Sequence, residues 1–250
     1  MEVLPPGLGA AGAAILVVAS FCTSALTAAF GLGGGLSLLA VMTVFLPVAV
    51  LIPLHGIVQL ASNGGRVIIQ RRGVAWAALP PFLLGGAIGA LIGARFVVAL
   101  PESALQISIG LFILLVTFVP IPRLGMLGFA GFALTGAVTT FLSMFFGATA
   151  PIMAALFAQT FKARETVVAT LAAVTAIQHA LKAVAFFAMG IVLWPYAALL
   201  LAMIVTGFLG TLAGTALLRR LDERYFRVML RTILAILALD LVRRGVLGLL

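Results

Sequence analysis

The chain has few charged residues, and their scarcity indicates its class. Only 8% of the 250 residues are Asp, Glu, Lys or Arg, whereas 64% are hydrophobic and the mean hydropathy is +1.32. Residues 3–65, 124–161 and 183–218 contain no charge at all. A soluble domain of this length could not cover its surface with so few polar side chains. Each uncharged run can hold one or more membrane-spanning helices of about 20 residues.

Cysteine and acidic residues are also scarce, which excludes further classes of site. Cys22 is the only cysteine, so an internal disulfide framework is excluded, and its place in an apolar run predicts a small buried side chain. None of the acidic residues lies at the centre of an apolar run: they are Glu2, Glu102, Glu165, Asp222, Glu223 and Asp240. We therefore expect no carboxylate relay of the kind common in proton-coupled pumps. The two histidines are not spaced as metal ligands, so we predict neither a metal site nor a cofactor.

The net charge of +9 comes from 15 basic and 6 acidic residues and would suggest nucleic acid in a soluble protein. Here the basic residues lie mostly at the ends of apolar runs, a pattern typical of membrane topology, so the expected partner is a lipid bilayer and not nucleic acid. The apolar runs lack the alternation of a β-barrel, and a helix satisfies its own backbone groups in lipid. We predict an all-α polytopic membrane protein whose first helix is retained rather than cleaved as a signal.

Proline, glycine and charge divide the chain into five apolar segments on each side of an IPRLG break. They are 9–30, 36–51, 53–70, 74–100 and 103–119, then 126–143, 149–161, 166–189, 192–218 and 226–242. Internal repeats in an apolar chain are typical of transporter scaffolds. We therefore predict a first transmembrane repeat, 1–122, and a second, 123–250, which together form one transport domain. If the short segments after the glycine clusters re-enter without crossing, the count of crossings falls from ten toward eight.

The two halves also resemble each other in detail. Residues 31–35 fall opposite 145–149, with Gly33 matching Gly147, and Asn63 and Arg66 fall opposite His179 and Lys182. Two long segments share one glycine spacing, which predicts close helix packing rather than ligand contact: Gly86, Gly89 and Gly93 correspond to Gly207, Gly210 and Gly214.

Charge placement predicts that the repeats have inverted topology. Arg71 and Arg72 flank the Gly73 loop, whereas the corresponding loop at Gly190 carries no charge. Arginines crowd the loop after 192–218, while the corresponding loop at 100–103 carries only Glu102. Equivalent loops therefore fall on opposite sides of the membrane, and ten crossings with Arg71 in the cytoplasm leave both termini outside. Arg243 and Arg244, near the chain end, do not fit this pattern.

Two polar stripes interrupt the apolar segments. The first consists of His55, Gln59, Asn63 and Arg66, and the second of Thr175, Gln178, His179 and Lys182. Spacings of three and four place each set on one helical face, which is costly in lipid unless the faces meet each other or water. They line a substrate path or serve as interhelical hydrogen-bond partners with snorkelling cations. We expect Lys182 to meet a substrate charge more than Arg66, which lies one turn from Arg71.

The glycine clusters suggest helix N-termini inside the membrane. In the first, Gly33, Gly34 and Gly35 precede a short segment, and in the second Gly147 and Thr149 do so. Unpaired amides at a helix start bind anions, and glycine lets an oxyanion approach the backbone. Ser37, Thr149 and Gln178 would add neutral donors. A flexible break or a tight helix crossing is the alternative interpretation.

The FGLGGG run, the HGIVQLASNGGR helix with its RRG turn, the late GxxGxxxG segment and the weaker second copy together resemble the sulfite exporter TauE/SafE family, also called the toluene sulfonate uptake permease group. The resemblance implies movement of sulfite, sulfonates or related anions across the bacterial inner membrane, with about eight spans. The resemblance implies a functional role for Gly31, Gly33, Gly34 and Gly35 and for residues 55–66. The second half departs from the pattern, since it reads FFGATAP and keeps only Gly147 and Pro151.

The leading hypothesis is therefore a secondary transporter or facilitator for a small sulfur-containing anion, and not an enzyme. An anion leaving a cell with a negative interior needs no coupling ion, whereas uptake would need a cation held by histidine or backbone carbonyls. One alternative is an intramembrane enzyme that uses His55 or His179 with Cys22 or Ser37, and another is a non-transporting membrane assembly partner. Whether the chain forms a homo-oligomer stays open.

Overall fold

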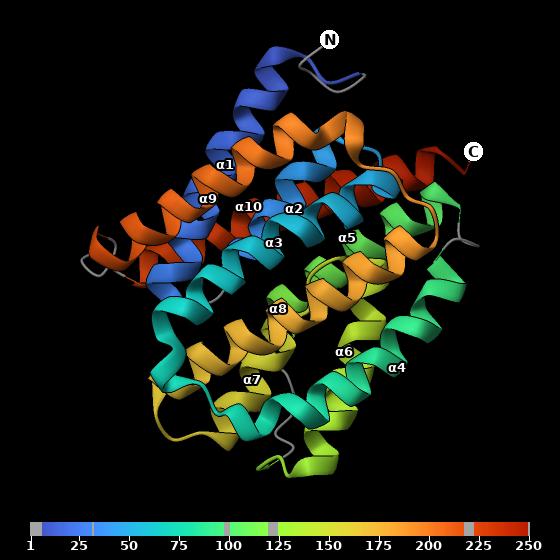
Figure 1. Cartoon of the computed structure of the whole chain (residues 1–250). Coiled ribbons are helices and arrows are strands. Elements are labelled where there is room, and N and C mark those ends of the chain that lie inside the picture. Colours follow the sequence, from blue (N-terminus) through green and yellow to red (C-terminus); the bar gives the residue numbers. More distant parts are fainter. Residues whose placement is uncertain (1–6, 32, 98–100, 120–124, 218–222, 250) are drawn as a thin grey trace.

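The computed structural model describes residues 7–31, 33–97, 101–119, 125–217 and 223–249, which form ten α-helices and three short 3-10 turns (Figure 1). The first five helices are α1 (Ala10–Phe30), α2 (Gly34–Phe45), α3 (Val48–Gln70), α4 (Leu79–Val97) and α5 (Glu102–Phe118). The second five are α6 (Phe129–Phe146), α7 (Ala150–Thr160), α8 (Arg164–Ala188), α9 (Ala197–Leu217) and α10 (Glu223–Leu247). The predicted all-α polytopic class is confirmed.

The helices follow the ten predicted segments, with one clear difference in the first half. The break expected at Pro53 lies instead at Leu46 and Pro47, and α3 continues through Pro53. Pro53 lies in the second turn of α3, where the missing N–H is tolerated because proline and its freed carbonyl are accommodated by neighbouring helices in membrane proteins.

Two of the helices are too short to cross a membrane. With 12 and 11 residues, α2 and α7 are about 18 and 16 Å long, against a hydrocarbon core about 30 Å thick. Within the described residues, six helices are long and apolar enough to span it: those beginning at Ala10, Val48, Trp76, Phe129, Arg164 and Trp194. The structure therefore favours the lower crossing count. The placement of both termini outside depended on ten crossings, and it stays a prediction.

The helices pack in pairs that link the two halves. Helix α1 packs along α9, α4 along α6, α3 along α8 and α5 along α10. The pair of α3 and α8 lies between the α1–α9 pair and the α4–α6 pair (Figure 1). If each helix of the first half corresponds to the helix five places later, these contacts map onto one another. The inverted orientation of the repeats itself remains a prediction.

Matched glycines lie at two close helix contacts. A methyl group on Gly89 of α4 would overlap the carbonyl oxygen of Ala137 on α6, and one on Gly210 of α9 would overlap the carbonyl of Phe21 on α1. A methyl group on Gly214 would likewise overlap the carbonyl oxygen of Ala25 on α1, whereas one on Gly93 would overlap the side chain of Met144 on α6. We call these two close contacts, α4 with α6 and α9 with α1, the glycine seams. They are helix-packing contacts, as predicted from the glycine spacing.

The structure corrects one detail of the repeat comparison. Gly31 ends α1 with a φ of 87°, and Gly147 ends α6 with a φ of 77°, a left-handed conformation that favours glycine. Gly31 and Gly147 are separated by the same number of residues as Arg66 and Lys182. Gly147 therefore corresponds to Gly31 and not to Gly33, because the shared requirement is a helix end rather than a helix start.

Large apolar side chains cover the outer surface. Examples are Leu91 of α4 and Leu201 of α9, with 69% and 64% of their surfaces exposed, as expected where lipid takes the place of water. Cys22, expected to be buried, is exposed on α1. That expectation was wrong because a cysteine behaves as a small apolar residue, and such residues are compatible with a lipid-facing position.

Candidate functional site

The two polar stripes predicted from sequence face each other across the contact between α3 and α8. Their members are buried, with exposed fractions of 0–6%. The rings of His55 and His179 meet edge to face, with centroids 5.7 Å apart and planes at 75°. Each stripe therefore places its polar groups against the other rather than against lipid.

A small cavity of about 30 Å³ lies between the stripes and the two helix breaks. Nine residues singled out from the sequence line it: Gly33, Gly35, His55, Gln59, Asn63, Arg66, Thr149, Thr175 and His179. The lining also includes Gly31 together with residues that sequence reasoning did not single out as site residues: Thr27, Leu36, Ala148, Ala150, Pro151 and Leu171.

Five of the predicted site residues do not line this cavity: Gly34, Ser37, Gly147, Gln178 and Lys182. Gly34 lies against α1, where a methyl group would overlap the carbonyl of Thr23. The Ser37 hydroxyl donates to the carbonyl of Gly33 at 2.8 Å, so its hydrogen is used at the start of its own helix.

The start of α2 points unpaired amides at the cavity. The first helical hydrogen bond runs from the Ser37 amide to the Gly33 carbonyl, so the amides of Gly34, Gly35 and Leu36 precede it. Among the described residues, these three amides have no hydrogen-bond partner, and no side chain caps this end. Such a helix start carries partial positive charge and suits a negatively charged group.

The start of α7 lies across the same cavity but offers fewer donors. Pro151 has no N–H, and the amides of Ile152 and Met153 bond to the Thr149 carbonyl. The Thr149 hydroxyl lies 3.0 Å from Gln178 Oε1 and 3.3 Å from the Thr139 carbonyl, and Gln178 Nε2 donates to the Thr139 hydroxyl at 3.2 Å. Thr149, Gln178 and Thr139 therefore satisfy one another, whereas the Thr175 hydroxyl, which lines the cavity from α8, is buried without a partner.

Arg66 is the basic side chain in the cavity wall. It is 2% exposed, and its Nη1 donates to Asn63 Oδ1 at 3.2 Å, while Asn63 Nδ2 donates to Gln59 Oε1 at 3.1 Å. The Nε and Nη2 atoms of Arg66 are buried without a partner. No ion pair of Arg66 with a carboxylate occurs in the described part of the chain. A buried, unpaired guanidinium is costly, and a bound anion would compensate it.

Lys182 is also buried, but its ammonium group has a hydrogen-bond partner. Its ammonium donates to the carbonyl of Gly147 at 2.9 Å, at the left-handed end of α6. We expected Lys182 rather than Arg66 to meet a substrate charge. The geometry favours the reverse, because Arg66 lines the cavity with free donors.

Thr27 is the polar lining residue that sequence reasoning missed. It lies one turn before Gly31 on α1, and its hydroxyl donates to the Thr23 carbonyl at 3.0 Å. A signal for it exists, since Ser20, Thr23, Ser24 and Thr27 recur at spacings of three and four in the first apolar segment and are all buried. That pattern marks an inward-facing side of α1.

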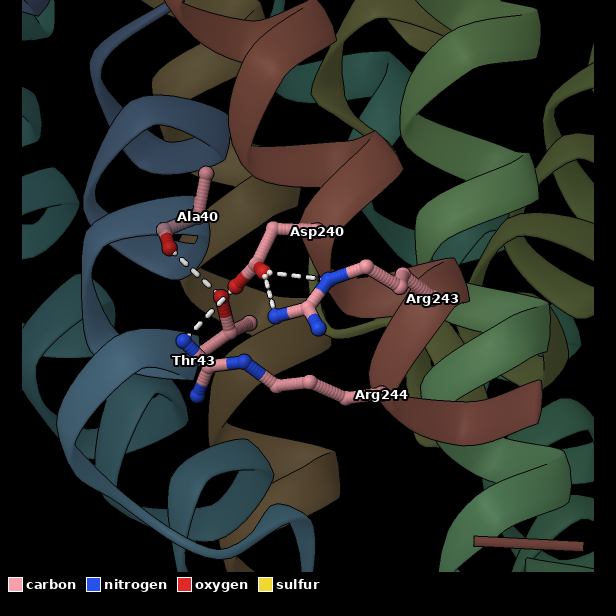
Figure 2. A network of polar contacts seen from close by, with 5 residues as sticks. All are labelled: Ala40, Thr43, Asp240, Arg243 and Arg244. Carbon is pink, nitrogen blue, oxygen red and sulfur yellow. Dashed lines mark hydrogen bonds and ion pairs between the residues drawn. The ribbon is translucent and has the colours of Figure 1, made fainter. Parts of the chain in front are cut away.

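A separate polar network lies on α10, away from the cavity. Asp240 pairs with Arg243 at 2.7 Å and with Arg244 at 2.6 Å, next to Thr43 of α2 (Figure 2). These three side chains are 31–64% exposed, so the pairs contribute little to stability. The carboxylate offsets part of the charge of the two arginines that did not fit the topology pattern.

Comparison with known proteins gives one significant result. The sequence profile of a family described as Sulfite exporter TauE/SafE matches residues 16–241, which is most of the chain. No curated protein and no solved structure matches the chain significantly.

Proposed function

Because this chain belongs to the Sulfite exporter TauE/SafE family, a family of sulfite and sulfonate transporters, we propose that it is a secondary transporter or facilitator that binds its substrate in the cavity between α3 and α8. The proposed substrate is a small sulfur-containing anion such as sulfite, a sulfonate or sulfoacetate, and the proposed location is the bacterial inner membrane. The multi-pass helical structure and the family together support transport across a membrane.

The observation that carries the proposal is the free side of Arg66. Two of its nitrogen atoms are buried without a partner, and Arg66 lines a cavity whose wall also includes the start of α2, where the amides are unpaired. A guanidinium and backbone amides together match the several acceptor oxygens of a sulfur oxyanion. Neutral solutes would leave the buried charge uncompensated.

The size of the cavity restricts which part of a substrate it holds. A volume of about 30 Å³ has room for about two water molecules, so it suits the compact oxyanion group and not a bulky organic tail. An organosulfonate would place its SO₃⁻ group here, and α2 and α7 would separate slightly to admit it.

The structure gives no support to the enzyme alternative. Neither of the nucleophiles considered lines the cavity, because Cys22 is exposed on α1 and the Ser37 hydroxyl donates to its own helix. The two histidines are therefore better explained by ligand contact than by nucleophilic catalysis.

The test is anion flux into proteoliposomes that contain the purified full chain, with sulfite, methanesulfonate and sulfoacetate as probes. Arg66→Gln should abolish saturable flux, whereas Arg72→Gln, an exposed arginine beyond the end of α3, should leave it unchanged. Equal flux in the two variants would contradict the site, and the absence of flux for all three anions in the wild type would contradict the function.

A further inference from the structure

The chain contains only two histidines, and both lie in the cavity wall. His55 is 0% exposed on α3 and His179 is 2% exposed on α8, and their rings are in contact at 5.7 Å between centroids. Histidine is the side chain whose charge ordinarily changes near neutral pH, so the burial of both histidines together beside the proposed anion site calls for a physical reason.

The hydrogen bond of His55 defines which ring nitrogen is free. Its Nε2 lies 2.8 Å from the carbonyl oxygen of Gly35, and because a carbonyl only accepts, Nε2 must carry a hydrogen. In the neutral ring Nδ1 is then an acceptor, and it is buried without a partner. The Nδ1 of His179 is likewise buried and unpartnered. An anion oxygen cannot approach an unprotonated Nδ1 favourably, but it can accept a hydrogen bond from a protonated one.

The charged surroundings make protonation depend on the anion. Lys182 lies three residues after His179 on α8 and beside Gly56, the residue that follows His55, and Arg66 shares the cavity wall from α3. The described parts of α2, α7, α6 and α9 carry no ionisable group that faces the rings, and Arg95 of α4 is exposed. The described acids are engaged or exposed elsewhere: Glu102 accepts from the Val48 amide, Glu165 is exposed, and Asp240 pairs with arginines.

Without an anion, a further positive charge would therefore be repelled, and none of the carboxylates whose side chains the structure describes compensates it. A bound anion reverses this balance, so anion and proton stabilise each other in the site. Two protons would place like charges on neighbouring rings next to Lys182, so the pair takes up one.

We propose that the anion binds together with one proton, which is held on Nδ1 of the His55–His179 pair, and that the protein moves anion and proton in the same direction. This inference rests on the proposed function. A monovalent sulfonate and one proton together carry no net charge, so the pH gradient rather than the membrane potential drives their movement.

The first test is calorimetric binding of methanesulfonate to the detergent-solubilised full chain, in buffers that differ in protonation enthalpy. Methanesulfonate keeps a fixed charge near neutral pH, so it cannot supply the proton itself. We expect uptake of about one proton per anion, and an affinity that falls up to about tenfold per pH unit on the alkaline side. Binding without proton uptake would overturn the inference. If methanesulfonate does not bind, sulfite is titrated in the same buffers, with its own titration subtracted.

The second test uses proteoliposomes that contain a trapped pH indicator. An inside-alkaline gradient should accelerate methanesulfonate entry, and entry should acidify the lumen. Anion flux without lumenal acidification would overturn the inference but leave the proposed function intact. The absence of any anion flux would instead contradict the proposed function.

Variants separate proton binding from a purely structural role of the rings. In the double variant His55→Gln/His179→Gln the amides can still donate to an anion but cannot take up a proton, so proton uptake should fall from about one to near zero while weaker binding remains. The single variants His55→Gln and His179→Gln each keep one ring and show which of the two holds the proton. Unchanged proton uptake in the double variant would overturn the assignment, and Arg72→Gln serves as the matched surface control. If the double variant does not fold, the wild-type proton stoichiometry alone decides.

Discussion

Arg66 on α3 and Lys182 on α8 occupy corresponding places in the two halves, and both are buried. Two nitrogens of Arg66 lack partners, whereas Lys182 donates to the Gly147 carbonyl. The neighbouring helix starts also differ in their number of free donors, since α2 offers three unpaired amides and α7 has Pro151, which lacks an N–H, in its first turn. In this comparison the first half has more unpartnered donors, while Lys182 and Gln178 of the second half bond to neighbouring groups and the Thr175 hydroxyl does not.

The largest effect is expected from Arg66→Gln. Loss of a buried charge that pairs with an anion should weaken sulfite or methanesulfonate binding by about 100-fold. The melting temperature of the anion-free protein should not fall, because Arg66 has unsatisfied nitrogens and their removal relieves a desolvation cost. Calorimetry and thermal unfolding in detergent measure the two effects. A large drop in melting temperature with unchanged affinity would reverse the roles assigned to the two halves.

The next effect concerns the helix start in the first half. A methyl group in Gly35→Ala would lie 3.3 Å from the Gln59 amide, at the edge of the cavity and close to the free amides. We expect about tenfold weaker anion binding, because the oxyanion can no longer approach the backbone closely. Gly64→Ala, with open space around the added methyl, is the matched glycine control on α3. Equal affinities of the two variants would contradict the role of the α2 amides.

Lys182→Met tests the second half. The change leaves the Gly147 carbonyl without its donor and should lower the free energy of unfolding by about 1–3 kcal/mol. Anion affinity should fall only about threefold, since the ammonium lies outside the cavity lining. Thermal unfolding and anion titration are compared with those of Arg66→Gln. A loss of binding as large as in that variant would remove the distinction between the halves.

The smallest expected effect is an increase in anion affinity. Pro151→Ala would restore an N–H to the first turn of α7, where Pro151 lines the cavity. One more donor at a helix start should strengthen anion binding about twofold to fivefold. Titration with methanesulfonate at constant ionic strength measures it, and unchanged or weaker binding would show that the α7 start takes no part in recognition.

Much of this arrangement was predictable from the sequence, because the relevant signals are local. Charge-free runs predicted the helices, and spacings of three and four predicted that His55, Asn63 and Arg66 share a face. The glycine match between Gly89 and Gly210 identified helix contacts that the structure confirms.

The difference between Arg66 and Lys182 could not be predicted in the same way. It depends on whether a carbonyl from another helix reaches the buried cation, as that of Gly147 reaches Lys182. Such a contact joins residues far apart in the chain, and no local pattern encodes it. Thr27 was missed for a related reason, since only the fold shows which polar residues of α1 reach the cavity.

The glycine seams have a consequence for how the molecule can move. They bind α1 of the first half to α9 of the second, and α6 of the second to α4 of the first. Helices whose backbones touch this closely do not slide past each other easily, so the moving bodies would be composite blocks, each made of helices from both halves of the chain. A change of access would then rock one of these blocks against the other, with the α3–α8 pair and its cavity lying between them.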